Sequence, residues 1–115
     1  MALIALPLSD RTCPIAVVVA RSQRKAMLSP FFAKCDGLLI IDPDALTREY
    51  RTNTERTNAF MCDLILANGI TKLVCGFIPE PDRDRLFASG VDIRIGSCAR
   101  PIEALVREFD ALPVA

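Results

Sequence analysis

Short apolar runs separated by polar turns predict a series of strands along the chain. The segments 14–20 (PIAVVVA) and 37–42 (GLLIID) have the length and composition of buried strands. The segment 47–53 (TREYRTN) alternates along its length and follows a turn, so we predict that it pairs with 37–42 as a hairpin. Strand patterns also occur in 70–76 (ITKLVCG) and 91–96 (VDIRIG).

Helical spacing of apolar residues appears in the second half of the chain. A helix is predicted from Thr52 to Gly69, with Thr52 and Glu55 as a capping box and Gly69 as its C-terminal stop. Shorter helices are predicted over 81–90 and from Pro101 onward, since proline is favoured in the first turn of a helix. Strands and helices therefore alternate from the middle of the chain to its end.

The N-terminal part allows more than one interpretation. Residues 1–9 (MALIALPLS) are also apolar, but Pro7 suits an edge strand better than a central one. Either this segment or 14–20 can be the first core strand. The segment 21–28 (RSQRKAML) is rich in positive charge, and we predict a loop or a short helical turn there.

This order of elements predicts one α/β domain over residues 1–115. Consecutive βα units join parallel strands by right-handed crossovers, whereas the first half forms a hairpin-like meander. We therefore expect a three-layer fold with a mixed sheet of about five strands flanked by three helices. Residues 1–13 would add one further strand at the N-terminus.

Composition narrows the classes of function. The 14 basic and 14 acidic residues cancel, which argues against a general nucleic-acid binder. No apolar run approaches the roughly 20 residues that span a membrane, and the N-terminus lacks the features of a signal peptide, so we expect a cytoplasmic protein without a membrane partner. The chain has no histidine, which removes the commonest general base and the commonest metal-binding nitrogen.

The chain contains five cysteines, an odd number, and no CxxC motif, so neither a disulfide framework nor a zinc ribbon is indicated. Cys75 and Cys98 follow predicted parallel strands, at the edge of the sheet where α/β proteins bind ligands. Cys98 also precedes the last helix, whose free N–H groups favour a thiolate. The alternative is that both cysteines are packing residues at strand ends.

Positive charge is concentrated in one part of this neutral chain. Arg21, Arg24, Lys25 and Lys34 lie close together in sequence and would attract a compact anion. The alternative is an ordinary solvated loop. The acidic residues do not converge on a two-metal site, and no glycine-rich phosphate loop is present. We therefore expect a protein that is not an enzyme.

The segment 31–42 (FFAKCDGLLIID) resembles a known motif. The dinitrogenase iron–molybdenum cofactor binding family, of the NifX and NafY kind, carries a His-Phe-Gly-Arg-Ala segment before a strand that ends in aspartate. The later pieces KLVCG, RDRLFASG, VDIRI and RPIEALVREF are similar too, and the resemblance covers about residues 14–110. It implies a ribonuclease-H-like fold. It also favours 14–20 as the first core strand, because the distance from there to Phe31 is normal for the family.

The chain departs from the family motif where the ligand is expected. Phe31 stands at the place of the histidine that is a candidate cluster ligand in the family, and Cys35 takes the place of the alanine. If a cluster is bound, the resemblance implies sulfur ligands, and we predict Cys35, Cys75 and Cys98 as metal ligands. Lys34, Arg24 and Phe31 complete the predicted cofactor-binding residues.

Three functions remain in competition. The first is a non-enzymatic carrier of an iron–sulfur or iron–molybdenum–sulfur cofactor, which exchanges it with donor and acceptor proteins as a monomer or homodimer. The second is a protein-interaction or regulatory domain that has lost the cluster site, which the apolar pair at Phe31 and Phe32 favours. The third is a thiol-based redox sensor that uses Cys98.

Overall fold

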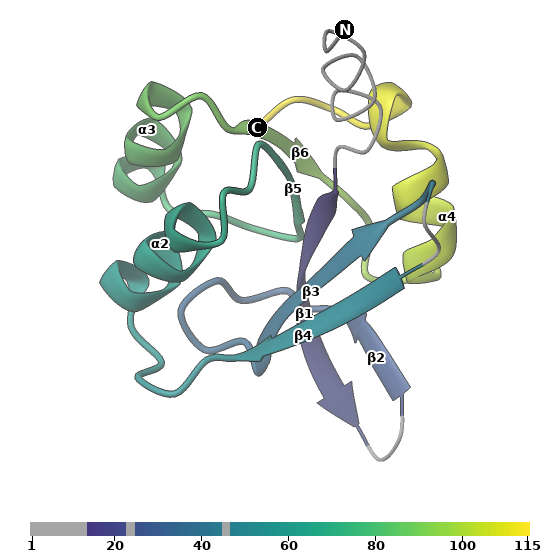
Figure 1. Cartoon of the computed structure of the whole chain (residues 1–115), viewed down its shortest axis with the longest axis horizontal. Coiled ribbons are helices and arrows are strands. Elements are labelled where there is room, and N and C mark those ends of the chain that lie inside the picture. Colours follow the sequence, from purple (N-terminus) through teal and green to yellow (C-terminus); the bar gives the residue numbers. More distant parts are fainter. Residues whose placement is uncertain (1–13, 23–24, 45–46) are drawn as a thin grey trace, which may run out of the picture.

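The computed structural model describes residues 14–22, 25–44 and 47–115, and it shows a mixed sheet with helices on both faces (Figure 1). The main path of the sheet has the order β4–β3–β1–β5–β6, with β1 (Ile15–Ser22) at its centre. The prediction of a three-layer α/β fold with three helices is confirmed. Residues 1–13, predicted as an added strand, lie outside the described residues, as does Arg24.

The first half of the chain forms an antiparallel meander. β1 pairs with β2 (Lys25–Leu28) and β3 (Gly37–Asp42), and β3 pairs with β4 (Thr47–Thr52). The prediction of a loop or helical turn over 21–28 is wrong, because β2 pairs with the last four residues of β1. An edge strand tolerates charged side chains, and Leu28 alone is buried in β2, so the apolar signal of this strand is weak.

β2 extends the sheet beyond the end of β5. β1 pairs with β5 (Lys72–Cys75) over Ile15–Val17 and with β2 over Val19–Ser22. The segment that leaves β2 at Ser29 therefore meets the chain where it leaves β5. This junction positions the candidate site described below.

Parallel strands joined by helices make up the second half, as predicted. β5 runs parallel to β1, and β6 runs parallel to β5. None of the helices in the described ranges is long and apolar enough to cross a membrane. The remaining elements are α2 (Asn58–Ala67), α3 (Glu80–Ala88), β6 (Asp92–Ile95), α4 (Ile102–Arg107) and the 3-10 helix η2 (Phe109–Ala111).

Helix α2 begins later than predicted. Its N-cap is Thr57, whose hydroxyl accepts a hydrogen bond from the N–H of Phe60 at 3.1 Å. The expected capping box is absent because Thr52 ends β4 and Glu55 lies in the loop that follows. The predicted stop at Gly69 is confirmed: this glycine has φ 67° and follows the C-cap residue.

The two faces of β1 build two separate core layers. Ala16 and Val18 pack in the cluster that includes Met61 and Ile65 of α2. Their neighbours in β1, such as Val17, face the opposite layer with α4 and η2. Burial on both faces explains why β1 is a continuous apolar run, and each fully buried side chain of this size contributes about 1.5–3 kcal/mol.

Candidate functional site

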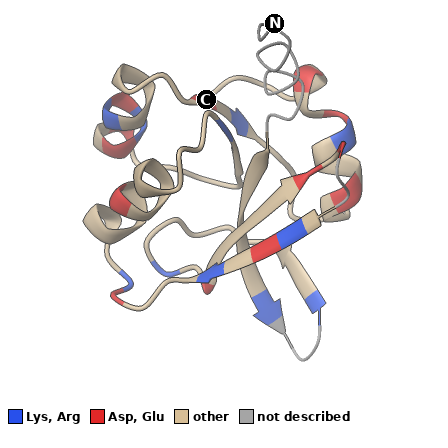
Figure 2. Ribbon diagram, in the orientation of Figure 1, with Lys and Arg blue, Asp and Glu red and all other residues tan. Residues whose placement is uncertain are grey.

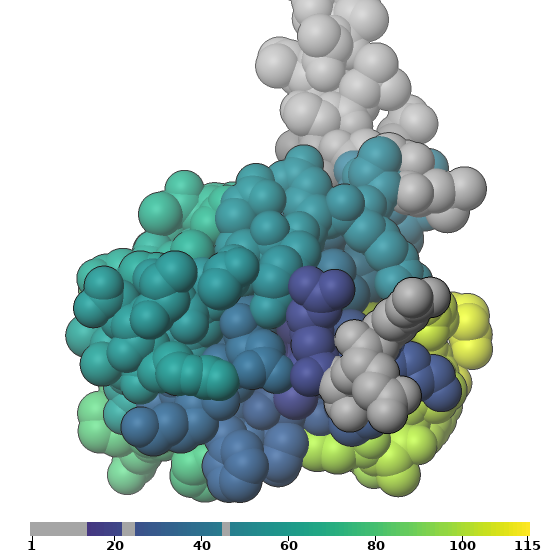
Figure 3. Space-filling model, turned by 90° about the horizontal axis from the view of Figure 1, so that it is seen from below, coloured from purple at the N-terminus to yellow at the C-terminus, as the bar shows by residue number. Residues whose placement is uncertain are grey.

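Three parallel strands, β1, β5 and β6, end at one side of the sheet, which we call the carboxyl edge. The chain leaves these strands after Ser22, Cys75 and Ile95. Ligands of open α/β sheets bind beyond this edge. Seen from that side, the end of β1, the segment around β2 and the segment before α4 are exposed on one face of the molecule (Figure 3).

Three chain segments converge on Gly76 at the carboxyl edge. A Cβ atom at this position would lie 2.6 Å from the carbonyl oxygen of Ser29, 3.3 Å from Cα of Pro30 and 3.2 Å from Sγ of Cys98. Only a residue without a side chain permits this approach. Gly76 therefore lets both the thiol of Cys98 and the loop that follows β2 approach the end of β5.

Cys98 opens into a hollow at the same edge. The hollow has a volume of about 440 Å³ and lies between β2, the segment before α4, and one side chain of β4. We call it the Cys98 hollow. Its lining consists of Lys25, Ala26, Met27, Arg48, Cys98, Ala99, Arg100, Pro101, Ile102 and Glu103.

The lining of the Cys98 hollow carries an excess of positive charge, with three cations and one carboxylate. Arg48 pairs with Glu103 at 2.5 Å, and Arg100 pairs with Glu108 at 2.7 Å. Lys25 forms no ion pair with any residue that the structure describes. Exposed pairs of this kind contribute about 0–1 kcal/mol each, so an incoming anion can compete for the guanidinium groups.

The loop after β2 turns sharply at Ser29. The Ser29 hydroxyl donates a hydrogen bond to the carbonyl oxygen of Phe31 at 2.9 Å and accepts one from the N–H of Phe31 at 3.0 Å. This turn separates the two phenylalanines: Phe32 is 2% exposed in the core, whereas Phe31 is 61% exposed. The predicted cofactor-binding residue Phe31 therefore faces solvent beside the carboxyl edge.

Two side chains from the β4–α2 connection hold this loop in place. The Asn53 amide donates to the carbonyl oxygens of Ala33 and Cys35, both at 2.9 Å. The guanidinium of Arg56 donates to the carbonyl of Lys34 at 3.2 Å and pairs with Asp36 at 2.9 Å. Our sequence analysis missed both residues, because they lie about 20 positions from their partners and no local motif indicates them.

The three predicted metal ligands occupy different environments. Cys35 and Cys75 are 1% and 0% exposed in the core beneath α2 and α3, and the Cys35 sulfur lies 3.7 Å from that of Met61. Burial raises the pKa of the Cys35 thiol, and it raises the pKa of Cys75 from 9.0 to about 12. Of the four cysteines within the described ranges, Cys98 alone is exposed.

These three thiols do not form one ligand group. No set of three His, Cys, Asp or Glu side chains among residues 14–22, 25–44 and 47–115 could hold a metal ion. The carboxyl edge of one chain thus offers a soft donor, Cys98, together with cations that suit an anion.

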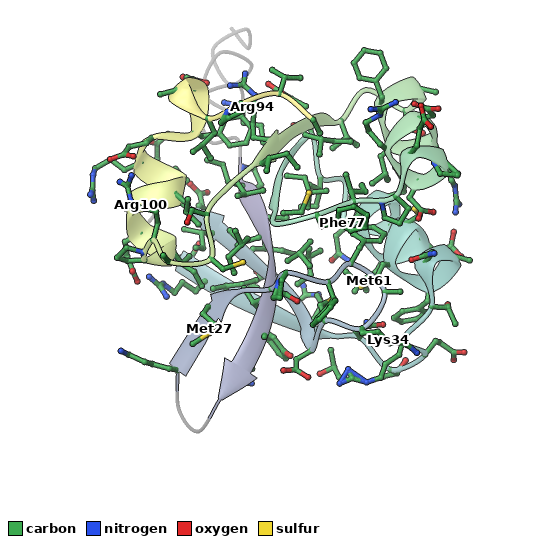
Figure 4. All side chains as sticks on the ribbon, turned by 180° about the vertical axis from the view of Figure 1, so that it is seen from behind. Met27, Lys34, Met61, Phe77, Arg94 and Arg100 are labelled. Carbon is green, nitrogen blue, oxygen red and sulfur yellow. The ribbon has the colours of Figure 1, made fainter. Side chains whose placement is uncertain are left out.

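Cations occur at several places along this part of the molecule. Blue segments mark the end of β1, the start of β2 and the loop of Lys34 (Figure 2). Met27 and Arg100 lie on the side of α4, and Lys34 and Phe77 on the side of α2 (Figure 4). Lys34 is exposed, and Lys25 lines the hollow.

Comparison with known proteins adds information at the level of the fold. No protein-family model matches the chain, and no curated protein matches it in sequence. The solved apo form of the orange protein from Desulfovibrio gigas is similar, with a TM-score of 0.77 and 18% identity over 90% of this chain and 93% of that one. A Thermotoga protein of the DUF35 family, described as a candidate NifB protein, has a TM-score of 0.70 and 17% identity over 89% of this chain and 90% of that one. These likenesses show a shared fold.

Proposed function

We propose that this protein is a non-enzymatic carrier of an anionic metal–sulfur cofactor, bound at the carboxyl edge. The observation that carries the proposal is the Cys98 hollow, where an exposed thiol opens into a cavity of about 440 Å³ with an excess of cations. Thiolates are preferred ligands of iron–sulfur clusters and of other soft metal centres. The cations would neutralise a negatively charged cargo.

The structural likenesses support this proposal. The orange protein has been solved in an apo form, that is, without a bound group, and the Thermotoga protein is described as a candidate NifB protein. The motif at 31–42 points in the same direction, toward iron–molybdenum–sulfur cofactors and the proteins that assemble nitrogenase. We therefore favour an iron–sulfur or iron–molybdenum–sulfur cargo that the protein receives from a donor and passes to an acceptor protein in the cytoplasm.

In this proposal, the residues of the edge have separate tasks. Cys98 supplies a thiolate to a metal of the cargo, which requires loss of its proton on binding. Lys25 and Arg100 stabilise the negative charge of the cargo. Phe31 is exposed on the loop that approaches Gly76 and stands at the position of the family histidine, where it would shield the bound group from water.

Anaerobic reconstitution with an iron–sulfur or molybdenum–sulfur cluster tests the proposal. The wild-type protein should gain a visible absorption band, and Cys98→Ser should retain at least tenfold less metal after gel filtration. Cys75→Ala is the matched control, because this buried thiol lies in the core and should not affect loading. Equal metal retention by the Cys98→Ser variant would reject the proposed site.

A second candidate function is supported by one observation. Phe31 and Phe77 are 61% and 57% exposed. Phe77 directly follows Gly76, and Phe31 directly follows Pro30, whose Cα would lie 3.3 Å from a Cβ atom at Gly76. Exposed aromatic side chains that lie close together are typical of protein-interaction surfaces. A protein-interaction domain without a cofactor would show no visible absorption after anaerobic purification, whereas the carrier purified with its cargo would be coloured.

A further inference from the structure

Arg21, near the end of β1, is an exposed cation that the proposed cargo site does not use. Its guanidinium carbon lies 4.7 Å from the centroid of the Tyr50 ring, so the charged group sits over the aromatic face. No ion pair joins Arg21 to any residue within 14–22, 25–44 or 47–115. The ring supports the guanidinium while its N–H donors stay available, and a planar guanidinium of this kind recognises carboxylates in a bidentate manner.

A second hollow, separate from the Cys98 hollow, surrounds this pair of side chains. It has a volume of about 540 Å³, and we call it the Arg21 hollow. Both oxygens of Asp36 are already engaged there, since one accepts a hydrogen bond from the Arg21 backbone N–H at 2.7 Å and the other pairs with Arg56 at 2.9 Å. The charge that the described residues leave unmatched is therefore that of Arg21. The lining consists of Arg21, Asp36, Tyr50, Thr52, Asn53 and Arg56.

The Arg21 hollow borders an open edge of the sheet. β4 lies at the end of the main strand order and pairs with β3 alone among the described strands (Figure 1). The Arg51 carbonyl points toward β3, because a Cβ atom at Gly37 would lie 2.5 Å from its oxygen. Neighbouring carbonyls of a strand point to opposite sides, so those of Tyr50 and Thr52 point away from β3. In agreement, the Tyr50 carbonyl accepts a long hydrogen bond of 3.4 Å from the guanidinium of Arg51.

An open strand edge can bind an extended peptide through main-chain hydrogen bonds. The side chains of such a peptide alternate between the two faces of the sheet, so every second one would lie on the face of Tyr50 and Thr52, where Arg21 is stacked. A carboxylate at that place would find the free donors of Arg21. Arg48 and Arg51 extend the positive charge along β4, each paired with one carboxylate (Figure 2).

We propose that the open edge of β4 and the Arg21 hollow form a docking surface for an extended acidic segment of a partner protein. The segment pairs with β4 through its main chain, and one of its carboxylates accepts two hydrogen bonds from Arg21. This inference does not depend on the Cys98 cargo. Arg21 pairs in register with Ala26, which lines the Cys98 hollow, so a protein docked here lies next to the site proposed for the cofactor.

Isothermal titration calorimetry with a synthetic peptide tests the docking surface. The probe is a capped peptide of about six residues, a typical strand length, in which glutamate alternates with threonine. The wild type should bind it, and Arg21→Gln should bind it about tenfold more weakly. Arg83→Gln is the matched control: it changes the net charge equally but lies on α3, which packs against β6 at the other end of the sheet, and should bind as the wild type does.

N-methylated peptides test the pairing with β4. Methyl groups on the glutamate amides and on the threonine amides block opposite sides of the peptide main chain, and only one side can face β4. One of the two methylated forms should therefore lose binding, and the other should keep it. Equal binding of both forms would show that the main chain does not pair with β4 and would overturn the proposal.

Two further results would also reject the docking surface. The first is equal affinity of the wild type for the acidic peptide and for the same peptide with glutamine in place of glutamate. The second is binding of inorganic phosphate, lost in Arg21→Gln, without binding of the peptide, which would assign Arg21 to a small anion. These titrations use the protein without cargo, so their failure leaves the carrier function standing, and failure of cluster loading leaves the docking surface standing.

Discussion

Gly76 is the residue on which the geometry of the candidate site depends most. Its missing side chain allows the carbonyl of Ser29 and the thiol of Cys98 to approach the end of β5. A methyl group there would meet the backbone carbonyl oxygen of Ser29 at 2.6 Å, and backbone cannot move aside as a flexible side chain can. The position of Cys98 thus depends on Gly76, which makes no polar contact with it.

Replacement of Gly76 by alanine should therefore destabilise the protein by about 1–3 kcal/mol, as overpacking typically does. Gly96→Ala is the comparison, since its nearest neighbour is the end of the Leu105 side chain at 2.9 Å, which can rotate. Urea unfolding of both variants should show the larger loss for Gly76→Ala. Equal losses would show that the Ser29 backbone yields easily.

The buried thiol of Cys75 makes the stability of the protein fall as the pH rises in the alkaline range. Its pKa is about 12 in the folded chain against 9.0 ordinarily, because burial disfavours the thiolate. The pKa of this thiol is higher in the folded chain than in the unfolded chain. Its contribution to the free energy of unfolding is therefore fully present below about pH 9 and is lost as the pH rises toward 12.

Above pH 9, the free energy of unfolding should fall by about 1.4 kcal/mol per pH unit for this thiol. The variant Cys75→Ala should lose stability less steeply by that amount, measured by urea denaturation between about pH 8 and 10.5. Identical slopes for the two proteins would contradict the assignment of this pH dependence to Cys75.

At the scale of elements, the loop between β2 and β3 is held by a distant connection. Asn53 is 4% exposed and donates to two carbonyl groups of the loop, and Arg56 adds two hydrogen bonds and an ion pair. Arg56 has φ 56°, an uncommon conformation for a residue with a side chain. The loop that presents Phe31 is therefore a fixed part of the fold.

Asn53→Ala should cost about 1–3 kcal/mol, because it leaves the carbonyls of Ala33 and Cys35 without this donor. Amide hydrogen exchange in residues 31–36 should rise together with this loss. The adjacent exposed residue provides the control: Thr54→Ala should change stability by less than about 0.5 kcal/mol. Unchanged exchange in Asn53→Ala would show that the loop does not depend on this amide.

The elements that local patterns specify could be predicted from the sequence. The apolar runs gave β1, β3 and β5, and the βα alternation correctly placed Cys75 and Cys98 at the ends of parallel strands. β2 could not be predicted because its pairing with β1 outweighs its weak apolar signal. The order of strands and helices also cannot tell whether a thiol at a strand end faces the core or solvent. Cys75 is buried in the core, whereas Cys98 is exposed.

At the scale of the whole molecule, the charge of the chain is zero, yet it is unevenly distributed. The 14 basic and 14 acidic residues cancel, but cations predominate in the lining of the Cys98 hollow. Figure 2 shows cations at the end of β1 and the start of β2, and several acidic residues on the helices. A neutral protein can in this way attract an anionic cargo to one edge.

The most direct test of this account is the metal retained after anaerobic reconstitution, compared among the wild type, Cys98→Ser and Cys75→Ala. We expect visible absorption and bound metal in the wild type and in Cys75→Ala, and at least tenfold less of both in Cys98→Ser. Retention that is equal in all three proteins, or absent from all three, would contradict a metal–sulfur cofactor bound through Cys98.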